Sequence, residues 1–315
     1  MSQINIDSNR ELKIESVIGK SRKKKKFNLS IYLFLIPSII FVGVFMLYPL
    51  LYSFGLSFME YNFVYDDKAK FVGFGNYIKM FTDKTFLTSL YNTLYFAVIF
   101  FVLLIGFSLG IALLLESKLK GMIILRTVVF LPVIVAMALS GVVFQWILNE
   151  NFGVLNHILT SIGLERFALN WLGNPNVAIY TIIAVSLWKY CGIICIMFLA
   201  GLQAIPKELY EAAKIDGAGS WSSFIHITLP NLKESFIITG VYGIMQSLKV
   251  FEQPFVLTYG GPADSTSTLY FYAWRNGFEF YDMGYASSIA YFIAGLVLAF
   301  SLLQIMLLNK NKSMN

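Results

Sequence analysis

The sequence predicts an all-α membrane protein with six transmembrane helices, and three observations support this fold class. Of the 315 residues, 57% are hydrophobic and 13% are charged, whereas soluble domains have about 45–50% and about 25%. Several uncharged segments reach the length of about 20 residues that a helix needs to cross the bilayer. Basic residues gather in alternate connections. The composition excludes a disordered chain, a disulfide-rich secreted miniprotein and an ordinary cytosolic enzyme.

The predicted helices lie near 30–52, 92–115, 128–148, 179–203, 235–258 and 285–308. The fourth contains Lys189, and the fifth contains Lys249 and Glu252. The first helix follows a basic segment, as a signal peptide does. It is longer than the usual apolar core of such a peptide and has no clear cleavage site, so we expect it to be retained. We therefore expect a basic cytoplasmic segment at 1–28, a transmembrane domain at 29–309 and a cytoplasmic tail at 310–315.

The distribution of basic residues predicts the orientation in the membrane. The N-terminal segment, the 116–127 and 204–234 loops and the C-terminus together hold 16 Lys and Arg, against 6 in the alternate loops. The positive-inside rule therefore places both termini in the cytoplasm of a multi-pass plasma-membrane protein. The run from Arg22 to Lys26 supplies five of the positive charges behind the net charge of +6. We interpret this run as a topology signal rather than a nucleic-acid site, with contact to anionic lipid as the alternative.

Motifs of enzyme chemistry are missing from the sequence. It has no nucleotide-binding P-loop, no zinc-protease motif and no nucleophile elbow. His157 and His226 fall in loops predicted on opposite sides of the membrane. Cys191 and Cys195 lie on one face of one helix, as expected for small apolar core residues. We therefore predict no catalytic residues and no metal site.

The 204–234 loop predicts a short helix–turn–helix. Pro206 suits the first turn of a helix, and Gly217 and Gly219 suit a left-handed turn at its end. Ser220 is a candidate N-cap of a second helix, which we expect Pro230 to end before the next span. A rigid helix pair between two spans favours a mechanical contact with another protein over catalysis.

The same loop carries a family motif. Its residues are Glu211, Ala212, Ala213, Gly217, Ile227, Leu229 and Pro230, and their spacing resembles the EAA loop of ABC-importer permeases. The chain is most similar to the carbohydrate-uptake group, the maltose and glycerol-3-phosphate type. Further similar stretches are Leu199–Pro206, Phe71–Tyr77, Asn92-Thr93, Gly260-Gly261-Pro262 and Ser265-Thr266. The resemblance covers about residues 30–308.

The resemblance implies a machine with several partners. The loop between the fourth and fifth spans would be a coupling helix that docks on a cytoplasmic ABC ATPase dimer. That dimer would bind the ATP and Mg, so this chain would hold no cofactor. A second permease would complete a heterodimer, and an extracytoplasmic solute-binding protein would deliver the cargo. Glu211 would contact the ATPase, and Gly217 would form the unobstructed turn.

Polar residues within the spans are candidates for a solute path, since ionisable groups in hydrocarbon are costly and usually functional. The candidates are Trp188, Lys189, Tyr190, Gln246, Lys249, Glu252 and Gln253. The two aromatic rings could stack on sugar rings, and the two glutamines project from similar helix faces. In the alternative, Lys189 snorkels and Lys249 pairs with Glu252 across one helical turn. The Tyr270–Trp274 cluster is a candidate for contact with the binding protein or for membrane anchoring.

The cargo implied by the resemblance is a sugar, with an oligosaccharide favoured. Glycerol-3-phosphate or a related polar solute is the alternative. A phosphate would favour arginine in the path, and the predicted spans contain none. An ion-coupled secondary transporter would need a relay of membrane acids, for which only Glu252 is available. A membrane scaffold would not explain the glycine-containing loop.

Overall fold

The computed structural model describes residues 29–117 and 121–309. The predicted segments 1–28 and 310–315 lie outside these ranges. The chain divides into an N-terminal unit that ends at Tyr52 and a larger unit that begins at Ser53.

The first helical segment runs from Leu29 to Leu56. It consists of α2 (Leu29–Val42), a π-helical turn η1 (Gly43–Leu47) and α3 (Tyr48–Leu56). The N–H of Tyr48 donates to the carbonyl of Gly43, which is the wider bond that defines a π turn. The predicted first span is therefore helical throughout, and its apolar part from Leu35 to Leu56 is long enough to cross a membrane.

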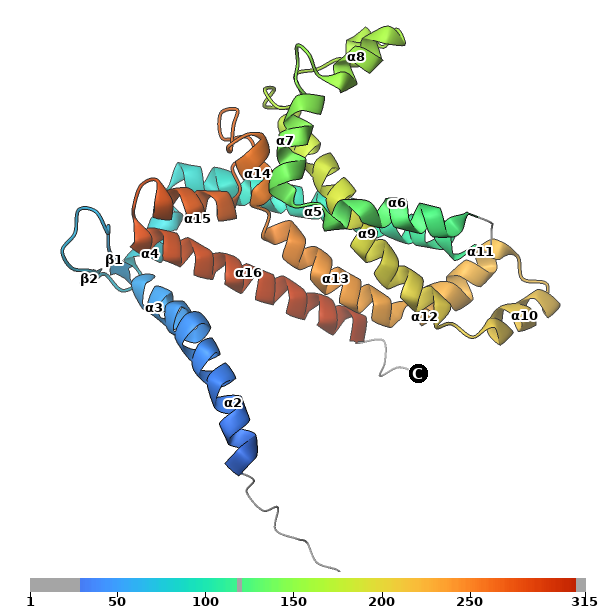
Figure 1. Cartoon of the computed structure of the whole chain (residues 1–315), viewed down its shortest axis with the longest axis horizontal. Helices are drawn as coiled ribbons and strands as arrows, with labels where there is room; N and C mark the ends of the chain where they lie inside the picture. Colours follow the sequence, from blue (N-terminus) through green and yellow to red (C-terminus); the bar gives the residue numbers. More distant parts are fainter. Residues whose placement is uncertain (1–28, 118–120, 310–315) are drawn as a thin grey trace, which may run out of the picture. The chain divides into compact units, whose positions relative to one another are not determined.

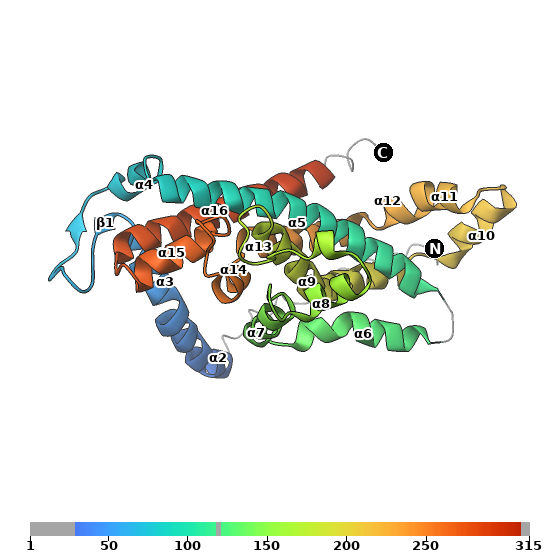
Figure 2. The same ribbon diagram turned by 90° about the horizontal axis from the view of Figure 1, so that it is seen from above.

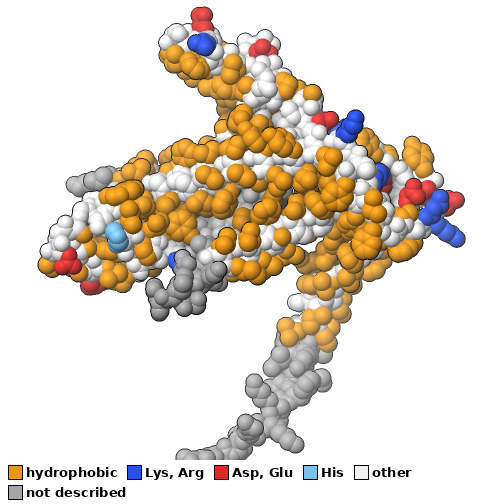
Figure 3. Space-filling view, turned by 180° about the vertical axis from the view of Figure 1, so that it is seen from behind, with side chains coloured by type: hydrophobic (Ala, Val, Ile, Leu, Met, Phe, Trp, Pro, Cys, Tyr) orange, Lys and Arg blue, Asp and Glu red, His pale blue; other side chains and the backbone are white. Residues whose placement is uncertain are grey.

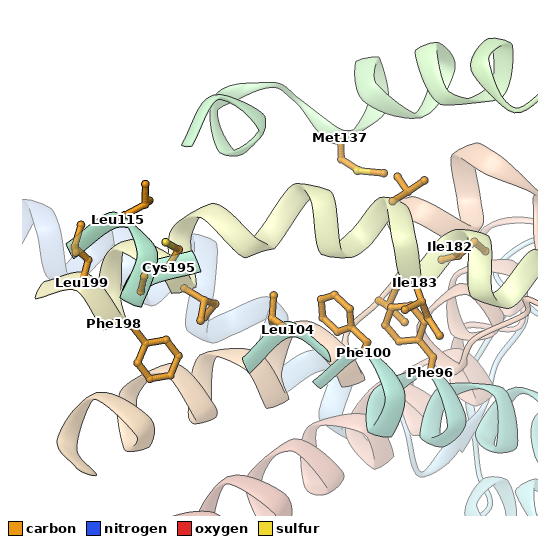
Figure 4. Packing of buried hydrophobic residues seen from close by; sticks show 14 of the residues in the cluster. Phe96, Phe100, Leu104, Leu115, Met137, Ile182, Ile183, Cys195, Phe198 and Leu199 are labelled. Atoms are coloured by element: carbon orange, nitrogen blue, oxygen red, sulfur yellow. The ribbon is translucent and has the colours of Figure 1, made fainter. Parts of the chain in front are cut away.

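The larger unit is a bundle built on α5 (Lys84–Glu116) and α9 (Ala178–Gln203). These two helices pack along each other, and α13 (Lys233–Leu248) contacts both of them and α16 (Met283–Asn309) (Figure 1). On the other side of α9 lies α6 (Met122–Ile134) (Figure 2). Figure 4 shows Phe96, Phe100 and Leu104 of α5 turned toward α9. All three are fully buried, and burying such side chains contributes about 1.5–3 kcal/mol each.

Two of the six predicted spans are wrong as single helices. The third is broken into α6 and α7 (Met137–Ile147), whose axes differ by 101°. The fifth ends at Leu248, and a short α14 (Glu252–Leu257) follows. Among the described residues, four helices are apolar and long enough to cross a membrane, or five if α6 and α7 form one broken span.

The two ends of the bundle carry different elements. One end has the antiparallel pair β1 (Met59–Glu60) and β2 (Lys70–Phe71), α4 (Gly75–Met80) and α15 (Leu269–Phe278). The opposite end has α10 (Lys207–Ile215), α11 (Ser220–Ser223), the π turn η3 (Phe224–Thr228) and α12 (Leu229–Asn231) (Figures 1 and 2). Between α7 and α9 the chain forms α8 (Val154–Ser161) and η2 (Glu165–Phe167). Hydrophobic side chains cover the length of the bundle, and charged ones gather toward its ends (Figure 3).

Hydrogen bonds show what the Asn92-Thr93 pair does at the α15 end. The Asn92 amide donates to the carbonyls of Asp264 (2.8 Å) and Ser267 (3.0 Å). Beside it, the Thr93 hydroxyl accepts from the N–H of Leu269 at 2.8 Å. The Asn92-Thr93 pair therefore secures the segment that joins α14 to α15, a structural role.

Asp83 joins three helices at the same end. One carboxylate oxygen accepts from the N–H groups of Thr85 (2.9 Å) and Phe86 (3.3 Å), which caps α5. The other accepts from the hydroxyls of Tyr272 (2.6 Å) on α15 and Tyr285 (2.8 Å) on α16. Burial raises the pKa of Asp83, but these hydrogen bonds outweigh it and hold the pKa below its ordinary value. Burial, together with the bond to Asp83, raises the pKa of Tyr272.

Candidate functional site

The 204–234 loop contains the predicted helix–turn–helix, with one left-handed glycine. Gly217 has φ of +79°, and the Ala218 N–H donates to the Ala213 carbonyl at 2.8 Å. This bond closes the end of α10 as glycine C-caps do. Gly219 is extended, with φ of −75° and ψ of 170°, and it caps α11 in place of Ser220. The prediction of a left-handed Gly219 and a Ser220 N-cap is therefore wrong.

Pro230 does not end the second helix. From Ser220 to Leu248 the backbone is helical except at Leu232, so the segment runs through α11, η3 and α12 into α13. The π turn places the Leu229 N–H on the Phe224 carbonyl, and Pro230 occupies the first turn of α12.

The motif residues divide between two surfaces of the loop. Glu211 and Ala212 are exposed on α10, and Leu229 is exposed on α12. Ala213 and Ile227 are half-buried. The Tyr210 hydroxyl lies 2.9 Å from that of Thr228, so a hydrogen bond joins the two arms of the loop. The arrangement presents a rigid pair of helices with the Gly217 turn at its tip.

Five of the seven predicted path residues line one pocket of about 200 Å³. They are Tyr190 of α9, Gln246 of α13, Lys249, Glu252 and Gln253. Val250, Phe251 and Tyr270 complete its wall. The break between α13 and α14 forms the pocket, so Gln246 and Gln253 reach it from separate helices rather than from one helical face.

Lys249 and Glu252 do not form the predicted pair across one helical turn. Within residues 29–117 and 121–309, the ion pairs join Lys79 with Asp282 and Arg275 with both Asp264 and Glu279. The pairing was predicted from an unbroken helix, but Lys249 follows α13 and Glu252 begins α14. Both charged groups therefore line the pocket separately.

Trp188 and Lys189 have other contacts. The Trp188 ring meets the Phe144 ring of α7 edge-on, with centroids 5.0 Å apart. The Lys189 ammonium donates to the carbonyls of Pro132 (2.9 Å), Val133 (3.1 Å) and Val135. These carbonyls lie at the break between α6 and α7. Neither the path nor the snorkelling alternative included this role.

Two further residues were not identified from the sequence: Gln145, which bonds α14, and Phe251, which lines the pocket. The Gln145 amide of α7 donates to the Val256 carbonyl of α14 at 2.6 Å, and the signal for it was a lone amide in an otherwise apolar span. Phe251 lines the pocket and stacks on Phe255 with centroids 5.2 Å apart. Nothing in the sequence separated Phe251 from the many other phenylalanines.

The aromatic cluster at 270–274 is divided between structural and exposed positions. Phe271 is fully buried, and Tyr272 donates to Asp83. Tyr270 is 39% exposed and lines the pocket. The Arg275 guanidinium bonds the Glu279 carboxylate at 3.1 Å, and the Tyr259 hydroxyl donates to the same carboxylate.

The apolar bundle, its two broken segments and the polar pocket at a break define a helical membrane transport protein. Residues 121–311 match the family described as binding-protein-dependent transport system inner membrane component. The probable ABC transporter permease YurN of Bacillus subtilis is 37% identical over 87% of this chain and 94% of its own length. The lactose transport system permease LacF of Rhizobium radiobacter is 34% identical over 91% of this chain and 96% of its own. The chain belongs to this family of ABC-importer permeases.

A solved structure shares the fold. A crystal structure of a bacterial ABC transporter involved in the import of alginate contains a chain that matches 90% of this one, with a TM-score of 0.78 and 24% identity. The match covers 96% of that chain. The family match and the relatives at 37% and 34% identity confirm the resemblance to ABC-importer permeases inferred from the EAA motif.

Proposed function

We propose that this chain is the permease subunit through which a sugar, with an oligosaccharide favoured, crosses the plasma membrane into the cytoplasm. Relatives at 34% identity are named as transporters of lactose, of arabinooligosaccharides and of trehalose and maltose. The observation that carries the proposal is the pocket at the α13–α14 break, where amide, hydroxyl, charged and aromatic groups converge.

The chemistry of this pocket suits a neutral sugar. Gln246 and Gln253 offer both donors and acceptors, and Glu252 and Tyr190 complete the set needed for hydroxyl groups. The rings of Phe251 and Tyr270 offer apolar faces. Ligand pockets usually enclose about 300–1,000 Å³, which is more than the volume of about 200 Å³ of this pocket. A second permease would supply the remaining wall.

We place the 204–234 loop in the cytoplasm as the contact with the ATPase dimer. Support comes from the exposed Glu211 and Ala212, and from the position of α10 opposite the α4 and α15 end. Both termini would then be cytoplasmic, and the chain would cross the bilayer six times, with the α6–α7 and α13–α14 segments each completing one crossing. The solute-binding protein would approach at the α15 end, and the partner ATPase would hold the ATP and Mg.

Glycerol-3-phosphate is the weaker candidate. Phosphate recognition commonly uses arginine, whose fork binds two oxygens. The one arginine in a predicted or observed spanning segment among the described residues is Arg126 of α6, and its guanidinium donates to the Leu115 carbonyl at 2.8 Å. The pocket offers Lys249 beside Glu252, a mixed charge that favours a neutral cargo.

Reconstitution with the partner permease, ATPase and binding protein tests the coupling role. Glu211→Lys should abolish uptake and weaken co-purification of the ATPase, because the reversed charge lies on the proposed contact. Glu234→Lys is the matched control, since Glu234 is also exposed at this end but lies outside the motif. Normal uptake by Glu211→Lys, together with no ATPase bound to the tagged chain, would contradict the proposal.

The cargo is tested by thermal shift of the binding protein against sugars and glycerol-3-phosphate. Glu252→Gln and Gln253→Ala should then reduce uptake of the same compound while the ATPase still co-purifies. A binding protein stabilised by glycerol-3-phosphate alone would overturn the sugar assignment.

A further inference from the structure

Lys189 binds the free end of a broken helix. Its ammonium donates to three carbonyls, those of Pro132, Val133 and Val135, at the point where α6 ends and the chain turns through 101° into α7. The last carbonyls of any helix lack partners within it, and leaving them unpaired in an apolar surrounding is costly. An ammonium has three donors, and a cation is favourable at a helix C-terminus. One side chain therefore provides hydrogen bonds to three carbonyls at the break between α6 and α7.

A second contact fixes α6 on α9 one turn further along. A Cβ built on Gly192 would lie 2.3 Å from the Val129 carbonyl oxygen, a distance that no side chain can occupy. The backbones of α6 and α9 are thus in direct contact at Gly192, three residues after Lys189. The two contacts together fasten the last turns of α6 to α9.

The α7 half of the broken segment is fastened to a different helix. A Cβ built on Gly141 would lie 2.4 Å from a methyl of Val256 on α14. One turn later the Gln145 amide donates to the Val256 carbonyl at 2.6 Å. The same α14 carries Glu252 and Gln253 of the pocket. A movement of α7 therefore carries with it one wall of the pocket.

We propose that Lys189 is a positioning residue that sets the angle at the α6–α7 break. α6 packs on α9, whereas α7 packs on α14 and, through Phe144 and Trp188, on α9. When the pocket changes its access, α7 and α14 shift together about the break at Val135. The change of access at the pocket rests on the proposed function. The joint between α6 and α7 does not, because it is a property of the helices themselves.

Distance measurements between spin labels test the joint directly. Labels at Leu131 on α6 and Val143 on α7 suit this, since both positions are exposed. The native Cys191 and Cys195 would first be replaced by serine and alanine. In the assembled transporter, Lys189→Met should broaden the distribution of distances, and Lys189→Arg should restore a narrow one. Lys249→Met removes a cation of the pocket that has no bond to α6, so it should leave the distribution unchanged.

Transport per ATP hydrolysed gives the functional outcome. Uptake per ATP should fall about tenfold in Lys189→Met, as expected when hydrogen bonds from a charged donor are lost. It should fall less in Lys189→Gln, which keeps two donors, and least in Lys189→Arg. A narrow distribution and normal coupling in Lys189→Met would overturn the proposal. So would an equal loss of coupling in Lys189→Gln and Lys189→Met, because the two donors that Gln keeps would then have no effect.

If Lys189→Met does not assemble, Lys189→Gln decides the matter. Its shorter side chain has two donors for the three carbonyls, so it should still broaden the distribution, and a wild-type distribution in that variant overturns the proposal. The distances require no cargo. The wild-type transporter could carry no sugar while the distances between the labels still change when Lys189 is substituted. That result would refute the sugar assignment and support the joint at Lys189.

Discussion

At the scale of single residues, Asp83 connects parts of the chain that are about 200 positions apart. It caps α5 through one oxygen and accepts from Tyr272 and Tyr285 through the other. A carboxylate that accepts several hydrogen bonds is strongly stabilised in its charged form. The carboxylate therefore acts as a fastening between α5, α15 and α16.

Replacing Asp83 by alanine should destabilise this end of the bundle. The lost cap costs about 0.5–2 kcal/mol, and a tyrosine hydroxyl left unpaired costs about 1–3 kcal/mol more. Thermal unfolding in detergent should show a lower midpoint for Asp83→Ala. Glu60→Ala, at an exposed position of the same end, is the control and should change little. Equal midpoints for the two variants would contradict the role of Asp83.

The stabilisation by Asp83 should depend on pH in the acid range. The folded pKa lies below the ordinary value of 3.8, so the unfolded chain binds this proton more readily. The contribution is therefore fully present above about pH 4 and is lost as the pH falls through the folded pKa. Unfolding midpoints measured from pH 6 down to pH 3 should fall less steeply in Asp83→Ala than in the wild type.

The chemistry of single residues predicted the pocket better than it predicted the long-range hydrogen bonds of Asp83 and Asn92. Tyr190, Gln246 and Glu252 stood out because polar groups are rare in apolar spans, and the structure brings them together. Asp83 gave no such signal, and Asn92 stood out only through the motif resemblance, which did not show its partners. The partners of both residues are carbonyls and hydroxyls far along the chain. Such partners are determined by tertiary packing rather than by local pattern.

At the scale of elements, the turn after α10 depends on one backbone conformation. Gly217 has φ of +79° and open space around it, whereas Gly219 has equally open space but an extended backbone. Gly217→Ala should strain the turn by about 1–2 kcal/mol and lower ATPase co-purification and uptake. Gly219→Ala is the matched control with the same added methyl. Similar losses in both variants would contradict the dependence of the turn on the positive φ of Gly217.

The contact between α6 and α9 allows a second matched comparison. Gly192→Ala would force the two helices apart, because the added carbon meets the Val129 carbonyl. Overpacking of this kind costs about 1–3 kcal/mol. Gly106→Ala on α5 is the control, since nothing lies within 4 Å of its added carbon. Thermal unfolding should separate the two variants, and equal midpoints would argue against a tight α6–α9 contact.

Apolar length predicted the unbroken helices but not the breaks. α5, α9 and α16 follow from long apolar segments, although α5 begins eight residues before the predicted start. The turn between α6 and α7 lies in an uncharged segment as well, and Lys189 from another helix satisfies its carbonyls. A break stabilised by a distant side chain leaves little trace in its own sequence.

At the scale of the whole molecule, cysteine labelling tests the proposed orientation. Tyr65 lies in the connection between β1 and β2, and Ile215 lies at the end of α10. They are 80% and 87% exposed. An impermeant maleimide should label Tyr65→Cys in intact cells, and should label Ile215→Cys only after the membrane is opened. The reverse pattern would place the coupling loop outside and contradict the orientation.

The position of the pocket at a helix break also bears on how such a protein can change its cargo. Phe251 lies between α13 and α14, outside both helices. If the pocket holds the solute as proposed, a substitution of Phe251 would alter the surface offered to it without removing a helical residue from the bundle. Recognition can therefore drift while the scaffold persists.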